Sequence, residues 1–438
     1  MIKQTPIQYE IVKQKIEESN LQHIGQASIR EIKKLVDCIE AESGKKFIRM
    51  EMGVPGLPPV QIGVDAEIKA MKQGVASSYP DIYGIPSLKK EISRFVKNFM
   101  NIEVNEENCI PTVGSMQGGF AAFITANRMY EEKDTTLFID PGFPVHKQQL
   151  KVLGQKWESF DVYNYRSEKL KGKLESYLKK GNISCILYSN PNNPSWICFT
   201  EKELKIIGEL ADKYNAIVIE DLAYIAMDFR TDMSKPGIPP FQPTVANYTQ
   251  NYILLISSSK AFSYAGQRIG MMVMSDQLFV KRSKGLLRNF TSDQFGYAMI
   301  FGTVYALSAG ITHSTQYGLA AMLKAVNDGR YNFVETVREY GEKAKTMKKL
   351  FTENGFQIVY DKDEDKPIAD GFYFTLSYPG LSGGELLNEL LYYGISAISL
   401  AITGSTRTEG IRACVSLVQR EQFAVLEKRL RQFHRDHS

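Results

Sequence analysis

Cysteine is scarce in this chain and is not clustered. Five cysteines are scattered over 438 residues, and none has the C-x-x-C spacing of paired zinc ligands or of a redox disulfide. We therefore expect reduced, mostly buried thiols, no metal site and a cytoplasmic location. Excess charge is lacking too, because 53 basic and 49 acidic residues give a net charge of +4 without a long basic block. This balance predicts no nucleic acid and no membrane surface as a partner.

Long apolar runs are equally rare. The N-terminal sequence MIKQTPIQYEIVKQKIEE has no apolar core of the kind that a signal peptide needs. Residues 294–323 contain no Asp, Glu, Lys or Arg, and residues 295–311 are largely apolar. This segment is long enough for a membrane span, but its interspersed Gly, Ser and Thr and the lack of a second span favour a buried helix.

Short apolar runs alternate with longer amphipathic segments in the middle of the chain. Runs of this length, apolar on both faces, are typical of strands in a parallel sheet that helices cover. We therefore predict an α/β fold with a mostly parallel sheet flanked by helices. The predicted strands are residues 109–113, 136–140, 184–189, 216–221, 252–257 and 270–275.

The length of the chain favours two domains. After about residue 320, charged helices and isolated strands such as GFYFTLSY and GIRACVSL replace the alternating pattern. We expect a large domain over residues 61–319 and a smaller α+β domain built from both chain ends, residues 1–60 and 320–438. The N-terminal segment is expected to be helical up to about Ser43, and DKDEDKP (361–367) to be a solvated loop.

In open parallel sheets, ligands bind beyond the carboxyl ends of the strands. After the first strand, Gly114-Ser-Met-Gln-Gly-Gly119 opens a helix whose free N–H groups suit a phosphate, although such a turn also serves plain strand-to-helix packing. Phe143, in a proline-framed loop, can stack on a flat ring or fill the core. Asn193 can donate to an oxyanion or only shape a turn.

Two strand ends carry charged side chains. Asp221 follows AIVIE, where a carboxylate needs a partner, and a salt bridge or a helix cap is the plain alternative. Lys260 follows YILLISSS. Lysine is rarely buried without a reason, and a desolvated lysine with a lowered pKa is the usual imine-forming nucleophile. A lysine that reaches solvent from a loop is the alternative.

Together these groups match the needs of one cofactor, pyridoxal 5′-phosphate (PLP). Its phosphate needs the helix-opening turn, hydroxyls and a cation such as Arg268. Its ring needs an aromatic face, its pyridinium nitrogen a carboxylate, its phenolate oxygen two donors, and its aldehyde a lysine. The side chains that would meet these needs are Phe143, Asp221, Asn193, Tyr224 and Lys260.

The segment SSSKAFSYAGQRIG (257–270) is similar to the S-x-S-K-x-x-x-x-x-G-x-R-x-G signature of class I/II aminotransferases, which have the aspartate aminotransferase fold (PLP fold type I). The order of the glycine turn, aromatic, Asn-Pro, Asp-x-x-Tyr and lysine motifs is also that of the family, from about Arg30 to Arg431. The resemblance implies a PLP enzyme that moves an amino group between an L-amino acid and a 2-oxo acid. It also implies a homodimer with shared active sites.

The resemblance assigns roles to residues at the cofactor. Lys260 forms a Schiff base with PLP and then moves the proton at the substrate Cα, and Asp221 pairs with the pyridine nitrogen. Asn193 and Tyr224 hydrogen-bond the ring phenolate, and Phe143 stacks on the ring. The implied phosphate ligands are Ser257, Ser259, Arg268 and the backbone of Ser115 and Met116, with Tyr79 reaching the phosphate of the neighbouring subunit.

The resemblance also assigns residues to the substrate. Arg412, in GIRACVSL, clamps the α-carboxylate, for which the guanidinium fork is well shaped. A structural ion pair is the alternative role for this arginine. Gly53 brings its backbone close to the substrate. The smaller domain, which carries Arg412, is expected to close on the bound substrate.

Two positions depart from the family. Its N-P-T-G motif is Asn193-Pro194-Ser195-Trp196 here, which removes a glycine and introduces an indole. Met116 stands where some relatives with acidic substrates carry a lysine, and no arginine is assignable to a side-chain carboxylate. These departures favour a neutral or aromatic substrate over aspartate or glutamate.

The residues do not distinguish transamination from related PLP reactions at the same carbon. C–S β-lyases and amino-acid decarboxylases of the same fold keep these residues, because the protein selects the bond that breaks by orienting it to the ring. A PLP-sensing regulator without turnover would need an added DNA-binding module. About fifty N-terminal residues without a basic reading helix leave no room for such a module.

Overall fold

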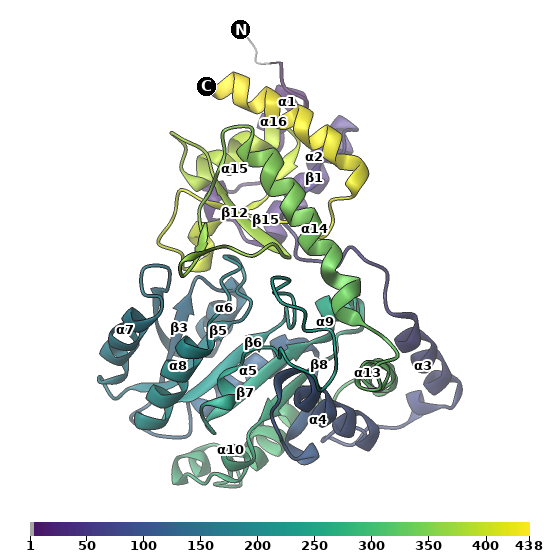
Figure 1. The fold of residues 1–438 in the computed structure, drawn as a ribbon, viewed down its shortest axis with the longest axis vertical. Helices are drawn as coiled ribbons and strands as arrows, with labels where there is room; N and C mark the ends of the chain where they lie inside the picture. Colours follow the sequence, from purple (N-terminus) through teal and green to yellow (C-terminus); the bar gives the residue numbers. More distant parts are fainter. Residues whose placement is uncertain (1–3) are drawn as a thin grey trace. The chain divides into compact units, whose positions relative to one another are not determined.

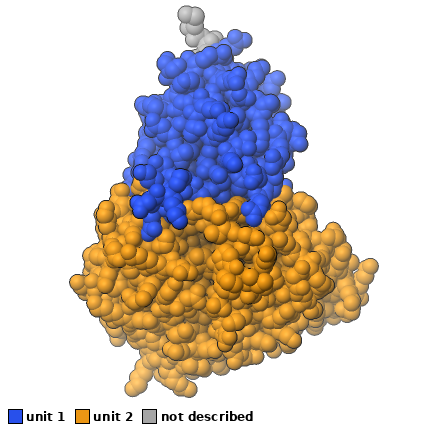
Figure 2. All heavy atoms as spheres, in the orientation of Figure 1, with its two compact units in different colours: residues 1–56, 193–197, 338–438 blue, residues 57–192, 198–337 orange. Residues whose placement is uncertain are grey.

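A computed structural model describes residues 4–438, and the chain falls into two compact units (Figure 2). Unit 1 comprises residues 1–56, 193–197 and 338–438, and unit 2 comprises residues 57–192 and 198–337. The predicted domain boundaries at 60/61 and 319/320 stay a prediction, because a compact unit need not be a domain that folds on its own.

Unit 2 is built on a seven-stranded sheet flanked by helices, as predicted for an α/β fold (Figure 1). Every residue of the central strands is buried, which explains why the sequence shows continuous apolar runs there. In spatial order the strands are β2 (Cys109–Thr112), β8 (Gly270–Met274), β7 (Tyr252–Ser257), β6 (Ile217–Leu222), β5 (Ile183–Ser189), β3 (Thr135–Asp140) and β4 (Lys156–Asp161).

The strand directions place one set of strand ends at a single edge of this sheet. Strands β7, β6, β5, β3 and β4 each pair in parallel with the next, whereas β8 pairs antiparallel with both β7 and β2. Strand β8 is therefore the one reversed strand. Its amino end, near Arg268, consequently lies at the same edge as the carboxyl ends of the other six strands.

Strand β4 is the one strand of this sheet that the sequence pattern does not predict. It is an edge strand that pairs only with β3, and its first two residues, Lys156 and Trp157, are exposed. Its sequence, KWESFD, lacks the apolar run on which the other strands were predicted. An edge strand needs no second apolar face, so it leaves a weaker sequence signal.

The uncharged segment that begins at Gln294 forms short helices against the sheet layer. It contains α11 (Phe295–Tyr297), a π-helix (Ala298–Val304) and α12 (Tyr305–Ser308), and most residues up to Val304 share an apolar core with helix α5 (Gly114–Ala126). Core packing thus explains the apolar part, while Tyr305 and Leu307 are exposed. No helix within residues 4–438 is long and apolar enough to cross a membrane.

The remaining helices of unit 2 lie around this core. Helix α8 (Glu201–Lys213) begins with a capping box in which Thr200 and Glu203 bond each other's backbone N–H groups. The other α-helices are α3 (Gln61–Lys72), α4 (Pro86–Met100), α6 (Pro144–Leu153), α7 (Glu168–Leu178), α9 (Ser258–Ala261), α10 (Asp276–Val280) and α13 (His313–Asn327); α14 (Phe333–Thr352) spans the boundary at residue 337.

Unit 1 is a smaller α+β arrangement. Its main sheet has the order β14 (Ile398–Ser399), β15 (Ile411–Cys414), β12 (Tyr373–Ser377) and β9 (Gln357–Ile358), all antiparallel. Two short pairs complete it: β1 (Ile48–Arg49) with β13 (Ile395–Ser396), and β10 (Lys362–Asp363) with β11 (Lys366–Pro367). The helices are α1 (Tyr9–Glu18), α2 (Ile29–Ser43), α15 (Gly383–Tyr392) and α16 (Phe423–His437).

Several predictions from the sequence can be compared with the structure of unit 1. Helix α2 ends at Ser43, as predicted, because Gly44 follows in the left-handed conformation that terminates helices. The two segments predicted as strands are β12 and β15. The predicted loop 361–367 instead contains the β10–β11 hairpin, and Asp363 in it is buried.

Candidate active site

The sheet edge defined above gathers most of the predicted cofactor residues of unit 2. Asp221 lies near the end of β6, Ser257 ends β7, and Lys260 follows in the short helix α9. Strand pairing puts Ser257 opposite Gly270, and Gly270 opposite Thr112, so β7, β8 and β2 end side by side. The half-buried Lys260 therefore stands at the rim of this sheet, among the groups that the sequence predicted.

A glycine-lined cradle lies at the start of helix α5. Gly114 has φ +64°, and a Cβ there would lie 2.7 Å from an Nη atom of Arg268. A Cβ on Gly270 would lie 2.8 Å from the Ser115 nitrogen. No side chain caps the N-terminus of α5. Its first N–H groups lie at the positive end of the helix dipole, which favours a bound anion. The two glycines keep the arginine and these amides close together.

Arg268 is an exposed cation at this cradle. Its Nη1 donates to the Ala265 carbonyl at 2.9 Å, and within residues 4–438 it forms no ion pair. The Arg268 backbone has φ +49°, in the left-handed region that bulky residues seldom occupy. An unneutralised guanidinium beside uncapped helix amides can bind a phosphate.

Three consecutive serines precede Lys260, the first of them the last residue of β7, and all three are buried. The Ser257 hydroxyl oxygen accepts from the Ser259 N–H at 3.1 Å, and the Ser258 hydroxyl donates to the Ile269 carbonyl at 2.5 Å. Ser258 thereby ties this turn to the start of β8. The turn is held rigid by its own hydrogen bonds, which fixes the backbone from which Lys260 extends.

Asp221 has a neighbour that the sequence analysis missed. His146 Nε2 lies 3.3 Å from the Asp221 Oδ2 atom, and both side chains are more than nine-tenths buried. The ring of His146 also meets the edge of Phe143, with centroids 5.7 Å apart. Gly119 gives it room, because a Cβ there would lie 3.3 Å from the imidazole. A polar residue one turn into the helix after Phe143 was the available signal.

The loop after β5 is held by a buried acid. Glu220 accepts from the Thr244 hydroxyl at 2.5 Å, from the Val245 N–H at 3.1 Å and from the Asn190 amide at 3.4 Å. The Asn190 side-chain oxygen accepts from the Phe199 N–H, so one side chain joins both ends of the loop. Burial raises the pKa of Glu220 to about 7, despite these stabilising donors.

Glu220 predicts a pH-dependent stability. The pKa of Glu220 is higher in the folded chain than in the unfolded chain, so protonated Glu220 adds to the free energy of unfolding below pH 4.5. This contribution is lost as the pH rises through about 7. The loss is on the order of 2–3 kcal/mol. We expect Glu220→Gln to remove this part of the difference in melting temperature between pH 4.5 and pH 7.5. Glu209→Gln, at an exposed position, is the control. An unchanged pH profile in Glu220→Gln would contradict the prediction.

Unit 1 contains a second polar cluster, centred on Arg412 of β15. Its side chain is 1% exposed and forms no ion pair with any residue of the described chain. Nη2 donates to the Glu51 carbonyl at 2.6 Å and Nη1 to the Asn193 side-chain oxygen at 3.2 Å, while Nε has no acceptor. The other buried arginine, Arg166, pairs with Glu203. A buried guanidinium without an acid is costly, and a ligand carboxylate would supply the missing charge.

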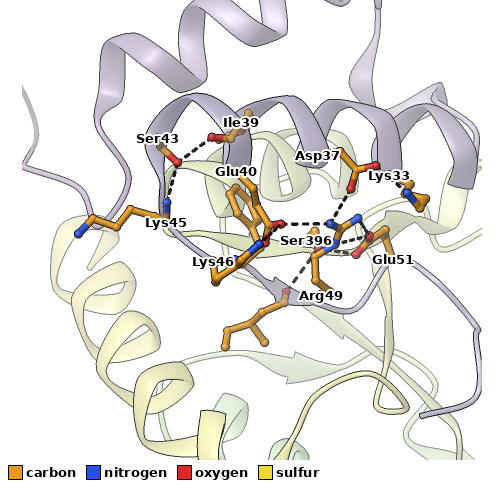
Figure 3. Close-up of polar contacts among 12 residues, drawn as sticks. Lys33, Asp37, Ile39, Glu40, Ser43, Lys45, Lys46, Arg49, Glu51 and Ser396 are labelled. Atoms are coloured by element: carbon orange, nitrogen blue, oxygen red, sulfur yellow. Dashed lines mark hydrogen bonds and ion pairs between the residues drawn. The ribbon is translucent and has the colours of Figure 1, made fainter.

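Glu51, whose backbone carbonyl accepts from Arg412, has its side chain bound in a separate set of polar contacts. Figure 3 shows these side-chain contacts. The Glu51 side chain is fully buried, with Oε1 2.8 Å from Arg49 Nε and Oε2 2.5 Å from the Ser396 hydroxyl. Arg49 also pairs with Asp37 of helix α2 at 2.8 Å. The acid of this cluster is therefore neutralised by Arg49, and only its backbone carbonyl serves Arg412.

The predicted site residues thus fall into two groups. Unit 2 carries Lys260, Asp221, Tyr224, the phosphate candidates and Phe143, whereas unit 1 carries Arg412, Asn193 and Gly53. A Cβ on Gly53 would lie 2.0 Å from the hydroxyl of Tyr373, so only glycine fits there. Tyr79 lies in unit 2 and is 93% exposed, away from any core. The roles implied for all these residues stay predictions.

Comparison with solved structures defines the fold. The chain is similar to a double mutant of Thermus thermophilus aspartate aminotransferase, with a TM-score of 0.73 and 17% identity over 93% of this chain and 96% of that one. It is also similar to alanine aminotransferase from Pyrococcus furiosus, with a TM-score of 0.73 and 20% identity over 96% and 99% of the two chains. The fold is that of the aspartate aminotransferases.

Sequence comparison defines the family. The family model described as aminotransferase class I and II matches residues 45–429, so the chain belongs to that family. A probable aspartate aminotransferase of Methanocaldococcus jannaschii is 26% identical over 383 residues, 85% of this chain and 88% of the relative. LL-diaminopimelate aminotransferase of Natranaerobius thermophilus is 23% identical over 346 residues, 78% and 79% of the two chains. The enzyme class is the transaminases (EC 2.6.1.-), and the family is in general PLP-dependent.

Proposed function

We propose that this chain transfers an amino group between an L-amino acid and a 2-oxo acid, with PLP held at the sheet edge of unit 2. The observation that carries the proposal is the position of Lys260. It stands one short turn beyond β7, at the edge that also carries Asp221, the three serines and Arg268. A lysine at such a place, beside a separate anion cradle, is what an aldehyde with a phosphate requires.

The residues fit this cofactor in detail. The cradle of Gly114, Arg268 and the first amides of α5 would take the phosphate, with Ser257 and Ser259. When bound, PLP supplies an electron-withdrawing ring that weakens the bonds at the substrate Cα. The carboxylate of Asp221, backed by His146 Nε2, would keep a proton on the ring nitrogen.

The remaining roles rest on the resemblance to the family. Lys260 Nζ would bind the aldehyde and then carry the proton to and from the substrate Cα. Tyr224 and Asn193 would donate to the phenolate oxygen, and Phe143 would cover one face of the ring. Arg412 would bind the substrate α-carboxylate, the anion that its buried guanidinium lacks. Gly53 would bring its backbone close to that substrate.

The proposal extends to the substrate and the assembly. Arg412 is the one buried arginine without an acidic partner within residues 4–438, so we propose amino acids with one carboxylate, neutral or aromatic in their side chains. We also propose a homodimer, in which the exposed Tyr79 reaches the phosphate of the neighbouring subunit. Sedimentation equilibrium measures this mass directly, and a monomer at micromolar concentration would contradict the dimer.

A half-reaction tests the proposed activity. The PLP-loaded protein is mixed with single L-amino acids, without an oxo acid, and its absorbance is followed. We expect neutral or aromatic donors to convert the yellow form to the spectrum of pyridoxamine phosphate, and a 2-oxo acid to restore the yellow form. A protein that stays yellow while pyruvate with ammonia, or carbon dioxide, is released would be a β-lyase or a decarboxylase.

A further inference from the structure

Trp196 occupies an unusual backbone position. Its φ is +65°, a left-handed conformation that bulky residues rarely adopt, and its side chain is fully buried. The position corresponds to a glycine in the N-P-T-G motif that this chain resembles. A residue of this size stays in such a conformation only where its surroundings hold it there. Two of its neighbours, Gly371 and Tyr373, lie in unit 1, the unit that contains Asn193–Ile197.

Gly371 supplies the space for the indole. A Cβ on Gly371 would lie 1.9 Å from Cε2 and 2.1 Å from Cζ2 of Trp196, which no real contact allows. The requirement for glycine here is one of space, since the clash alone excludes a larger side chain. Trp196 and Gly371 are therefore complementary in volume, because the indole ring fills the space that a side chain at residue 371 would occupy.

The indole supports Tyr373, and Tyr373 supports Arg412. The ring centroids of Trp196 and Tyr373 lie 6.2 Å apart at 67°, an edge-to-face contact. The Arg412 guanidinium carbon lies 4.4 Å from the centre of the Tyr373 ring. Tyr373 pairs with Cys414 across the β12–β15 ladder, which makes it the diagonal neighbour of Arg412 on the same face.

The segment that carries Trp196 also contacts Arg412 directly, through a side chain. Asn193, three residues before Trp196, accepts from Nη1 at 3.2 Å, and the Glu51 carbonyl accepts from Nη2 at 2.6 Å. The guanidinium is thus bound at two edges and on one face. The three groups that contact it are Asn193, the Glu51 carbonyl and the Tyr373 ring. Trp196 fixes two of them, because it anchors the turn that carries Asn193 and packs against Tyr373.

We infer that Trp196 is a positioning residue for Arg412, and that it acts together with Gly371 through Tyr373 and the Asn193 turn. The inference rests on the proposed role of Arg412 in binding the substrate carboxylate. A displaced indole would tilt Tyr373 and shift Asn193, so the guanidinium fork would no longer face the carboxylate squarely. Carboxylate affinity should then fall while the protein still retains PLP, because Lys260 and the cradle of Gly114 and Arg268 are unchanged.

Binding of an unreactive carboxylate tests the inference. Isothermal titration calorimetry on the PLP-loaded protein measures the Kd of 4-methylpentanoate, with 4-methylpentanamide as the uncharged control. We expect Trp196→Ala and Gly371→Ala each to raise the Kd of the acid about tenfold, and Trp196→Phe about threefold. The double variant Trp196→Phe/Gly371→Ala should bind better than Gly371→Ala alone, because the smaller ring tolerates the added methyl group.

Arg412→Lys, measured in parallel, separates the inference on Trp196 from the proposed role of Arg412 in binding the substrate carboxylate. Weak binding in Arg412→Lys together with wild-type Kd values in the Trp196 and Gly371 variants would overturn the inference alone. Wild-type binding in Arg412→Lys would overturn the proposed role of Arg412 itself. Trp196→Phe, which keeps an aromatic ring, stays measurable if the alanine variants fail to fold. Steady-state kinetics should show the loss in KM for both substrates, with kcat nearly unchanged.

Discussion

Replacement of Lys260 by alanine is expected to abolish transamination. The side chain is the proposed attachment point of the cofactor aldehyde and the proposed proton carrier at the substrate Cα. Loss of a general base lowers a rate by about 10²–10⁴-fold, and loss of the covalent step adds to this, so kcat should fall by at least about 10⁴-fold. The purified variant should also lack the absorbance band that the covalent link to Lys260 gives the wild type, because its PLP would be bound as the free aldehyde.

Lys260→Arg is the matched control for this prediction. It keeps the positive charge at the end of β7 but cannot form the covalent link, so it should be as inactive as the alanine variant. Both variants should still bind PLP, because the cradle of Gly114, Arg268 and the serines is untouched. An active Lys260→Ala enzyme with the absorbance band of the wild type would refute the assignment of this lysine.

Replacement of Arg412 by alanine is expected to raise KM for amino acid and oxo acid alike. The guanidinium is 1% exposed and has no acidic partner within the described chain, so a substrate carboxylate would be its counter-ion. Two charge-assisted hydrogen bonds are worth about 3–5 kcal/mol together, which corresponds to a loss of about 10²–10⁴-fold in kcat/KM. Both half-reactions should lose equally, because both substrates carry the same carboxylate.

Arg420→Ala serves as the control for Arg412. It removes an arginine of the same unit that already has a partner, Glu339, at 2.6 Å, and it should leave KM unchanged. Arg412→Lys should recover little, since an ammonium cannot offer the bidentate fork. Unchanged kinetics in Arg412→Ala would show that the arginine is structural, and the substrate carboxylate would then bind elsewhere.

The fold class was predictable because its signal is local. Strands β5, β6 and β7 are buried throughout, and each has a polar residue at or near its carboxyl end, so the strands and the candidate site could be predicted from the same apolar runs. The family match confirms the resemblance that the segment 257–270 indicated. The edge strand β4 lacked that signal, because only its last two residues, Phe160 and Asp161, are buried.

Other features depend on contacts between residues distant in sequence. His146 was missed because its partner, Asp221, lies 75 residues away, and a lone histidine carries no pattern. Glu220 shows the same limit, since its raised pKa arises from burial among loops that only the fold brings together. The complementarity of Trp196 and Gly371 was likewise invisible, although the tryptophan itself stood out against the family motif.

Chemical mapping of the cofactor attachment tests the central claim most directly. Borohydride reduction of the PLP-loaded protein fixes the cofactor on its lysine, and mass spectrometry of the tryptic peptides then locates the added mass. The account predicts a single phosphopyridoxyl group on Lys260, absent in Lys260→Arg. A group on another lysine, with Lys260 unmodified, would contradict the proposed active site.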